Sequence, residues 1–306
     1  MLISREYHSL NRFLIGVRSF SPSSVSRLSD TDTRRIYQFK TVNRFVCIKS
    51  IITGIDADRD KDFFFPGESH SFWETVFVSD GEITATADER IYKLKQGMLL
   101  FHKPMEFHRL IADGKNSSHL KIISFTAEGE LMKSFENRCF NLSLSEQDTF
   151  SEITDYFIKA YLAYSDSPDS FDYISNTAVT LLEGFLLRLK EKKEYTPRYI
   201  SYNEDIYYKI VKTMKNNCDK SLSVNDIARL LNMSASNVKR VFTLYSDIGI
   251  AKYFLNLRIR RAKELLQEGL SPYEVAEKLG FKPNYFYTVF KREVGTTPNK
   301  YAKSNR

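Results

Sequence analysis

The chain has 306 residues, of which 42% are hydrophobic, 14% aromatic and 27% charged. This length suggests two domains, and the composition is that of a globular protein that can bury a sizeable core. The longest apolar stretch, Val179–Leu189, contains two charged residues and is shorter than the ~20 residues that cross a bilayer. Cys47, Cys139 and Cys218 are too far apart for a disulfide framework or a metal-ligand motif, which favours the reducing cytoplasm. Composition thus excludes membrane-spanning and disulfide-rich classes.

Positive charge is concentrated towards the C-terminus. Residues 203–306 contain 19 Lys or Arg and 10 Asp or Glu, whereas residues 1–202 contain 26 and 28. The formal net charge of +7 therefore arises in the last third of the chain. Such asymmetry indicates that one domain meets a polyanion and the other does not.

The pattern of the first half of the chain predicts a loose extension followed by strands. We expect residues 1–36, which are rich in Ser and Arg, to form an N-terminal extension, with a transit peptide as the alternative. Residues 37–127 contain short segments rich in β-branched and aromatic residues, separated by turn signals such as Asp80-Gly81. This spacing predicts an antiparallel sandwich or small barrel. The expected strands are Phe39–Ile52, Trp73–Val78, Glu82–Ala87, Arg90–Leu94 and Met98–Phe101.

Residues 128–194 change to a helical period. Phe150–Ala163 and Ser175–Glu194 are the expected helices, and residues 195–202, which include Pro197, are the expected linker. The second helix carries a broad apolar stripe, which either packs on the barrel or joins two copies of the chain. The stripe consists of Ala178, Leu181, Leu182, Phe185, Leu186 and Leu189.

Residues 203–306 contain an internal repeat. A shift of 48 residues, without a gap, places Leu222-Ser223 on Leu270-Ser271 and Val241-Phe242 on Val289-Phe290. A repeat of this length implies two similar supersecondary units. The disfavoured alternative is a helical bundle with accidental repetition.

Each repeat has the pattern of a helix-turn-helix. Ser223 and Ser271 are predicted N-caps, and Pro272 is at a first helical position. Short helices at 224–231 and 272–279 precede turns at 232–234 and 280–282. Second helices are expected at about 235–245 and 283–294, with one apolar face each. Their other faces are free to enter the major groove of DNA.

The exposed faces carry groups that can bind DNA. Arg pairs with guanine and Asn with adenine, while Lys and hydroxyl groups hold phosphates. Taken singly, each residue is better explained as a solvated polar side chain than as a DNA contact. The candidate DNA-binding residues are Ser234, Ser236, Asn237, Lys239, Arg240, Lys282, Asn284, Tyr285, Tyr287, Thr288 and Lys291.

A single long helix is expected between the repeats, at Ile250–Gln267. Its apolar side includes Tyr253 and Leu257, Gly269 ends it, and four basic residues give it charge. These are Arg258, Arg260, Arg261 and Lys263. A stiff helix would hold the two units about one turn of DNA apart, ~34 Å, so that they contact adjacent segments of the major groove.

The stretch from Leu222 to Tyr301 resembles the DNA-binding domain of the AraC/XylS family of bacterial regulators. The segments "LSVNDIARLLNMSASNVKRVF", "LRIRRAKELL" and "SPYEVAEKLGF" carry the resemblance, together with the tail "YFYTVFKREVGTTPNKY". The resemblance implies two helix-turn-helix units, with Arg240 at the usual base-reading position. The second unit has Thr288 where the family usually has Arg. It therefore either holds phosphates or reads thymine methyl groups through Thr288.

Residues 65–125 resemble, more weakly, the cupin-type sensor barrel of such regulators. In that family the barrel often binds a small effector, commonly a sugar, and the following helices support dimers. The resemblance implies an effector pocket lined by His70, Trp73, Glu74, His102 and His108, with Trp73 either stacking on a sugar or belonging to the core.

The five histidines do not contain the pair, one residue apart, that opens the usual metal motif of enzymatic cupins. We therefore expect no metal, no cofactor and no catalysis, with the histidines satisfying hydrogen bonds. A cupin enzyme fused to a DNA-tethering module is one rival, which a stoichiometric transition metal would favour. A ligand-free architectural protein is the other.

The sequence thus predicts an α+β protein with a cupin-like antiparallel barrel, flanking helices at 128–194 for support or dimerisation, and an all-α DNA-binding domain at 203–306. We expect a cytoplasmic homodimer that binds promoter DNA, works with RNA polymerase and has no membrane contact.

Overall fold

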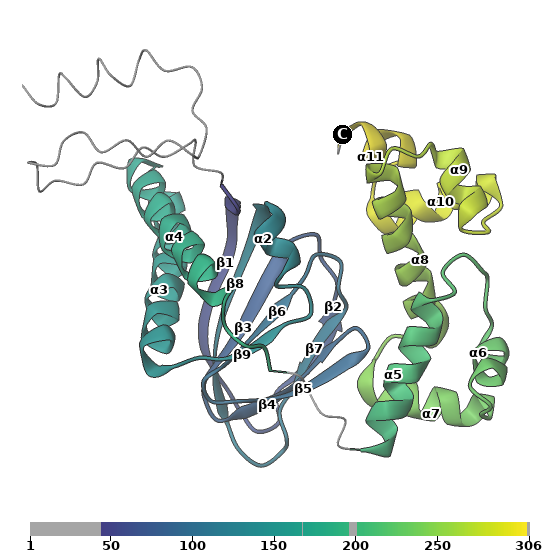
Figure 1. Cartoon of the computed structure of the whole chain (residues 1–306), viewed down its shortest axis with the longest axis horizontal. Helices are drawn as coiled ribbons and strands as arrows, with labels where there is room; N and C mark the ends of the chain where they lie inside the picture. The colour runs from purple at the N-terminus through teal and green to yellow at the C-terminus, as the bar shows by residue number, and fades with distance from the viewer. Residues whose placement is uncertain (1–43, 167, 196–200, 305–306) are drawn as a thin grey trace, which may run out of the picture. The chain divides into compact units, whose positions relative to one another are not determined.

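The computed structural model describes residues 44–166, 168–195 and 201–304 (Figure 1). The predicted N-terminal extension, the first residues of the expected barrel and most of the expected linker lie outside this part. Antiparallel sheets form the first half of the described chain and helices alone form the last part, so the predicted α+β class is confirmed. All three cysteines are free.

Two antiparallel sheets make up the N-terminal half. One has the strand order β1-β8-β3-β6-β9, and the other has the order β2-β7-β4-β5. The strands are β1 (Cys47–Arg59), β2 (Phe64–Glu68), β3 (Trp73–Asp80), β4 (Glu82–Ala87), β5 (Arg90–Lys95), β6 (Met98–His102), β7 (His108–Ile111), β8 (Ser118–Glu128) and β9 (Cys139–Asn141). A short helix, α2 (Glu130–Lys133), precedes β9.

Strand prediction was only partly correct. Four of the expected segments coincide with β3, β4, β5 and β6 to within two residues, but the first expected strand begins at Cys47 and continues to Arg59. The strands β2, β7, β8 and β9 were not predicted. Pro66 and Gly67 interrupt β2, and β7 and β9 are too short to show a period. Pairing with neighbours distant in sequence, rather than local pattern, stabilises these strands.

The central strand β3 is covered on both faces. Trp73 and Phe77 face a hydrophobic cluster that includes the helices, whereas Val76 and Val78 belong to the cluster between the two sheets. Because side chains alternate along a strand, Glu74 lies on the same face as Val76 and Val78. A carboxylate is thereby placed between the sheets.

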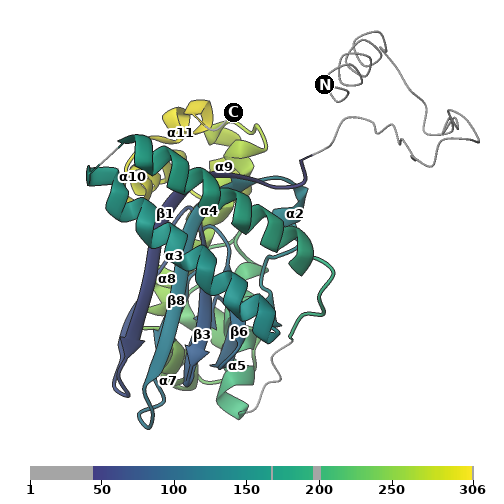
Figure 2. The ribbon, with the colours of Figure 1, turned by 90° about the vertical axis from the view of Figure 1, so that its left-hand side faces the viewer.

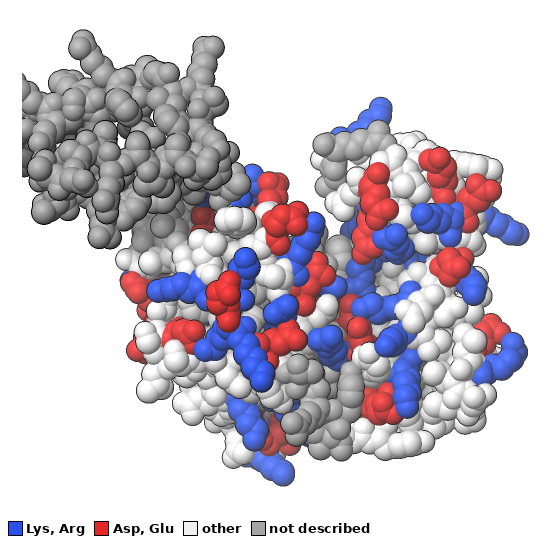
Figure 3. All heavy atoms as spheres, in the orientation of Figure 1, with Lys and Arg blue, Asp and Glu red and all other residues white. Residues whose placement is uncertain are grey.

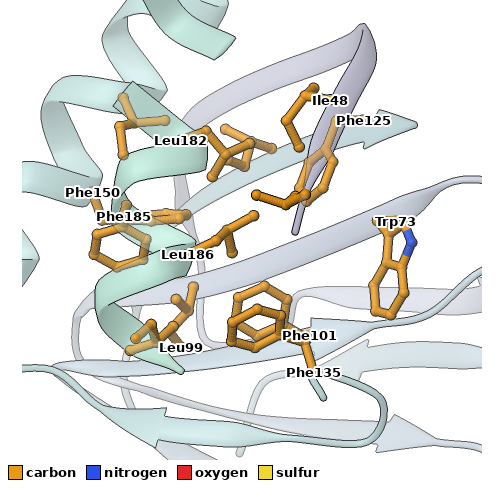
Figure 4. Packing of buried hydrophobic residues seen from close by; sticks show 14 of the residues in the cluster. Ile48, Trp73, Leu99, Phe101, Phe125, Phe135, Phe150, Leu182, Phe185 and Leu186 are labelled. Carbon is orange, nitrogen blue, oxygen red and sulfur yellow. The ribbon is translucent and has the colours of Figure 1, made fainter. Parts of the chain in front are cut away.

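Helices α3 (Leu144–Asp166) and α4 (Pro168–Leu189) cover the outer face of the five-stranded sheet (Figure 2). Both begin before the residues expected from the pattern. The α4 stripe packs against the sheet, where Leu182, Phe185 and Leu186 contact residues such as Phe101 and Phe125 (Figure 4). Packing on the barrel is therefore what this stripe does, and its part in a dimer stays a prediction.

The C-terminal helices surround two further clusters. They are α5 (Tyr202–Lys215), α6 (Val224–Leu230), α7 (Ala235–Tyr245), α8 (Ile250–Gln267), α9 (Pro272–Lys278), α10 (Pro283–Val294) and α11 (Pro298–Ser304). The helices α7, α8 and α10 have the predicted bounds. One cluster joins α5, α6, α7 and the first half of α8 to Ile91 and Phe107 of the N-terminal half, and the other lies within the second half of α8 and α9 to α11. Among the described helices, none is long and apolar enough to span a membrane.

Candidate nucleic-acid interface and barrel site

Local hydrogen bonds fix the start of the first helix in each unit. The Ser223 hydroxyl accepts from the backbone N–H of Asp226, and the Asp226 carboxylate accepts from the N–H of Ser223 at 2.9 Å. Ser271 and Glu274 make the same reciprocal pair. The predicted N-caps are confirmed, and the acidic partner completes a capping box that the sequence prediction had not used.

The turn of each unit requires a left-handed backbone. Asn232 has φ 53° and Gly280 has φ 63°. A Cβ atom added to Gly280 would lie 2.7 Å from the carbonyl oxygen of Asp219, which is too close for any other residue. The turn thus holds the second helix of each unit against the first.

The second helix of the first unit, α7, is buried on one face and exposed on the other. Val238, Val241 and Phe242 are fully buried. Ser234 is the N-cap, because its hydroxyl accepts from the N–H of Asn237. The residues predicted to face DNA that are exposed here are Ser234, Ser236, Lys239 and Arg240, and Asn237 is half-buried.

Arg240 is positioned by two amide side chains. Its Nη2 donates to Asn237 Oδ1 at 2.9 Å and to Asn203 Oδ1 of α5 at 3.3 Å. Both acceptors are uncharged, so these bonds orient the guanidinium without neutralising it. Asn203 was not among the predicted site residues, because nothing in its sequence neighbourhood links it to α7.

The second helix of the second unit, α10, repeats this design. Phe286, Val289 and Phe290 are fully buried. The Thr288 hydroxyl donates to the Asn284 carbonyl at 3.1 Å. The exposed candidates are Lys282, Asn284, Tyr285, Thr288 and Lys291, and Tyr287 is half-buried.

The basic residues of α8, which the sequence showed only as a source of charge, have different environments in the structure. Arg258 is 6% exposed and donates from Nε to the Cys218 carbonyl at 3.1 Å and from Nη2 to the Leu279 carbonyl. Its guanidinium carbon lies 3.7 Å from the ring centre of Phe281. Cys218 follows α5 and packs against the hydrophobic cluster of the first unit, whereas Leu279 and Phe281 belong to the cluster of the second. Arg258 therefore joins the two units through α8.

Arg260 of the same helix contacts the barrel. It donates from Nη1 to Asp88 Oδ2 at 2.8 Å, from Nη2 to Asp88 Oδ1 at 3.1 Å, and from Nη1 to the Met105 carbonyl at 2.8 Å. Asp88 is fully buried and also accepts from the N–H of Phe107 at 3.2 Å. Burial raises the pKa of Asp88, but the charges of Arg260 and Lys215 lower it by more, so the carboxylate stays charged.

Further ion pairs join the barrel to the C-terminal part. Lys215 Nζ lies 2.8 Å from Glu89 Oε2, and Arg109 Nε lies 2.9 Å from Asp247 Oδ2. Some of the basic side chains therefore already pair with acidic side chains of the same protein. On the face shown in Figure 3, Lys and Arg lie among Asp and Glu over the sheets and the helices alike.

Four of the five predicted effector residues lie together between the sheets. Glu74 Oε1 is 3.3 Å from His108 Nε2, and Glu74 Oε2 is 3.8 Å from His70 Nε2. The rings of His102 and His108 are stacked with centres 4.5 Å apart. Trp73 is the exception, because it points from β3 into the hydrophobic cluster on the opposite face (Figure 4).

Two acidic residues that sequence reasoning missed complete this group. Glu68 Oε1 lies 4.0 Å from His70 Nε2 and 3.9 Å from His108 Nε2. Glu106 is fully buried, and its Oε2 lies 2.9 Å from His102 Nδ1. The spacing of Glu68, His70 and Glu74 along the end of β2 and the start of β3 was the available signal.

The group carries opposite charges close together. Burial raises the pKa of Glu74, but the imidazoles of His108 and His70 lower it by more, to well below its usual range. Burial lowers the pKa of His108, but Glu74 raises it by more. For His102, burial and the neighbouring His108 lower the pKa and outweigh Glu106. The arrangement favours a cation beside the Glu74 carboxylate.

Two protein families match this chain. A helix-turn-helix domain matches residues 227–304, and the AraC-like ligand binding domain matches residues 51–139. The chain belongs to the AraC/XylS family. It is therefore a DNA-binding transcriptional regulator with an N-terminal ligand-binding domain and a C-terminal helix-turn-helix domain.

Individual known proteins align with much of the chain. The uncharacterized HTH-type transcriptional regulator YfiF of Bacillus subtilis is 24% identical over 76% of this chain and 77% of its own length. The HTH-type transcriptional activator RhaR of Mannheimia succiniciproducens is 23% identical over 78% and 87%. ToxT of Vibrio cholerae, solved with a naphthalenyl butenoic acid, is 14% identical, with a TM-score of 0.35 over 84% of this chain and 100% of that one.

Proposed function

We propose that this regulator reads one base pair through Arg240 and holds the neighbouring segment of DNA with its second unit. The observation that supports this is the uncharged support of Arg240, which Asn237 and Asn203 orient on the exposed face of α7. A positioned guanidinium can donate two parallel hydrogen bonds to the edge of guanine.

The second unit reads DNA differently. The hydroxyl hydrogen of Thr288 is donated to the Asn284 carbonyl, so it is not available to a phosphate oxygen. Of the two roles expected for this residue, apolar contact between its methyl group and a thymine methyl is therefore favoured. Lys282, the exposed N-cap residue of α10, and Lys291, exposed on α10, would supply the phosphate contacts.

The test uses operator fragments captured from genomic DNA by the purified full chain. Arg240→Ala should weaken binding to the captured site by about 1–3 kcal/mol, which corresponds to roughly 5- to 150-fold, and relax preference at one position. Arg138→Ala removes an arginine that pairs with Glu194 outside the helix-turn-helix units and should leave the affinity unchanged. An unaltered footprint and affinity for Arg240→Ala would exclude base reading by this residue.

We propose that the barrel is a sensor for a small effector, such as a sugar, rather than a catalytic domain. The Asp88–Arg260 pair supports this, because it links the barrel directly to the helix that joins the two DNA-binding units. The full chain should show a raised melting temperature with one member of a panel of monosaccharides, and that compound should change DNA affinity. A compound that binds and is consumed, with no effect on DNA affinity, would favour an enzyme.

We propose that the protein acts as a cytoplasmic homodimer that contacts RNA polymerase. Aromatic and aliphatic side chains on α3 and α4 remain exposed in the single chain, and exposed apolar groups of this kind favour a protein contact. They are Tyr161, Leu162 and Tyr173. Sedimentation equilibrium should give a dimer, and Leu162→Glu should give a monomer. A wild-type monomer at all concentrations would exclude this proposal.

A further inference from the structure

Four metal-ligating side chains meet at one end of the space between the sheets. Glu68 comes from the end of β2, His70 from the following loop, Glu74 from β3 and His108 from β7. One ligand atom of each lies within 4.8 Å of the other three. His108 is 1% exposed, whereas Glu68 is 53% exposed, so the group is buried on one side and open to solvent on the other.

Backbone carbonyl groups fix the tautomer of both imidazoles. His70 Nδ1 lies 3.0 Å from the Phe72 carbonyl oxygen, and His108 Nδ1 lies 3.2 Å from the Glu106 carbonyl oxygen. A carbonyl oxygen can only accept, so each Nδ1 carries a hydrogen. A neutral ring then presents a lone pair at Nε2.

Both Nε2 atoms are buried and form no hydrogen bond of normal geometry with the described residues. They face the carboxylates of Glu74 and Glu68 instead, at separations of 3.3 to 4.0 Å. A lone pair opposite a carboxylate oxygen is repulsive unless a cation lies between them. Between His108 and Glu74, which are 3.3 Å apart, a proton can be that cation. The other three separations, 3.8 to 4.0 Å, exceed hydrogen-bond distance, so a proton does not bridge them.

The four separations between histidine nitrogen and carboxylate oxygen, 3.3 to 4.0 Å, suit a shared metal ion. Two ligands that each lie ~2.1 Å from one ion are about 3–4 Å apart. Histidines that bind metals usually donate the other ring N–H to a carbonyl or carboxylate, as His70 and His108 do here. Imidazole with carboxylate is a donor set for Zn²⁺, Fe²⁺, Co²⁺ or Ni²⁺ rather than for Ca²⁺.

We propose that this group binds one divalent transition-metal ion through Nε2 of His70, Nε2 of His108 and the Glu74 carboxylate, with Glu68 as a fourth ligand. This differs from the expectation that the histidines only satisfy hydrogen bonds. Two nitrogen and two carboxylate ligands leave positions of an octahedral ion for an oxygen donor from solvent or an effector.

The experiment uses the full chain after treatment with EDTA and desalting. Titration with Co²⁺ should produce visible d–d absorption that saturates at one ion per chain, and Zn²⁺ should compete for the same site. His108→Ala and Glu74→Gln should weaken binding by at least about tenfold. His119→Ala is the control, because His119 also lies beside two carboxylates, Asp56 and Asp58, yet outside the group.

Folding of each variant is checked by circular dichroism. Glu68→Gln alters only a half-exposed side chain, and it should fold normally and weaken Co²⁺ binding by a few-fold. Absence of Co²⁺ absorption in the folded wild type, or equal affinity in the His108, Glu74 and Glu68 variants, would overturn the proposal. The titration contains no DNA, so its failure would leave the proposed reading of DNA by Arg240 unaffected.

Discussion

Replacement of Arg258 by methionine tests how the two helix-turn-helix units are held together. The change removes the guanidinium and keeps a long apolar side chain against Phe281. Hydrogen bonds from a charged group contribute about 1.5–3 kcal/mol each, and Arg258 makes two, to the carbonyl groups of Cys218 and Leu279. Loss of the buried charge also removes its desolvation penalty, which offsets part of this. We expect the free energy of unfolding to fall by about 2–4 kcal/mol.

The assay is urea denaturation followed by far-ultraviolet circular dichroism at 25 °C. Arg261→Met is the matched control, because Arg261 lies on the same helix, is 39% exposed and pairs with Glu264 and Glu268. Exposed pairs of this kind contribute about 0–1 kcal/mol. Equal urea midpoints for the two variants would refute the conclusion that Arg258 links the units.

The same variant should affect DNA binding in a specific way. Without Arg258 the distance and angle between the units are less restricted, while the exposed face of α7 is unchanged. The footprint on the captured operator should therefore shrink to the segment bound by the first unit. A full-length footprint, together with the expected loss of stability, would show that α8 alone fixes the spacing.

Three other substitutions have defined expectations. Asp88→Ala leaves the Arg260 charge buried without its carboxylate, and should lower the free energy of unfolding by about 3–5 kcal/mol, against about 1 kcal/mol or less for Asp205→Ala in an exposed pair. Equal urea midpoints would contradict this. Thr288→Val keeps a methyl group and should leave the DNA dissociation constant within about twofold, whereas a tenfold rise would show that the hydroxyl contacts DNA. Ser234→Ala removes the N-cap of α7 and should destabilise the chain by about 1 kcal/mol in a thermal melt, and an unchanged melting temperature would exclude that role.

The helical part of the fold was predictable because its signals are local. The bounds of α7, α8 and α10 follow from apolar periodicity and from breakers such as Gly269, and the structure adds the N-cap Ser234 and the C-cap Gly295. Sheet prediction was weaker, because a strand such as β7 depends on hydrogen bonds to β2 and β4 that no four-residue pattern reveals.

The candidate site residues, too, were only partly predictable from the sequence. Sequence reasoning grouped His70, Glu74, His102 and His108, but it missed Glu68 and could not assign the side of the sheet to which Trp73 points. A one-residue difference along β3 decides that Glu74 lies between the sheets while Trp73 packs under the helices.

The sequence by itself determined that two capped helical units, joined by one long helix, form the C-terminal region, because caps, turns and helical period act over a few residues. Only the tertiary structure decided which arginine of that helix faces solvent. Arg258, Arg260 and Arg261 are chemically identical in the sequence, yet the first joins the two units, the second pairs with a buried aspartate and the third is exposed. Burial of a charge depends on which distant groups fold against it, and no local pattern contains that information.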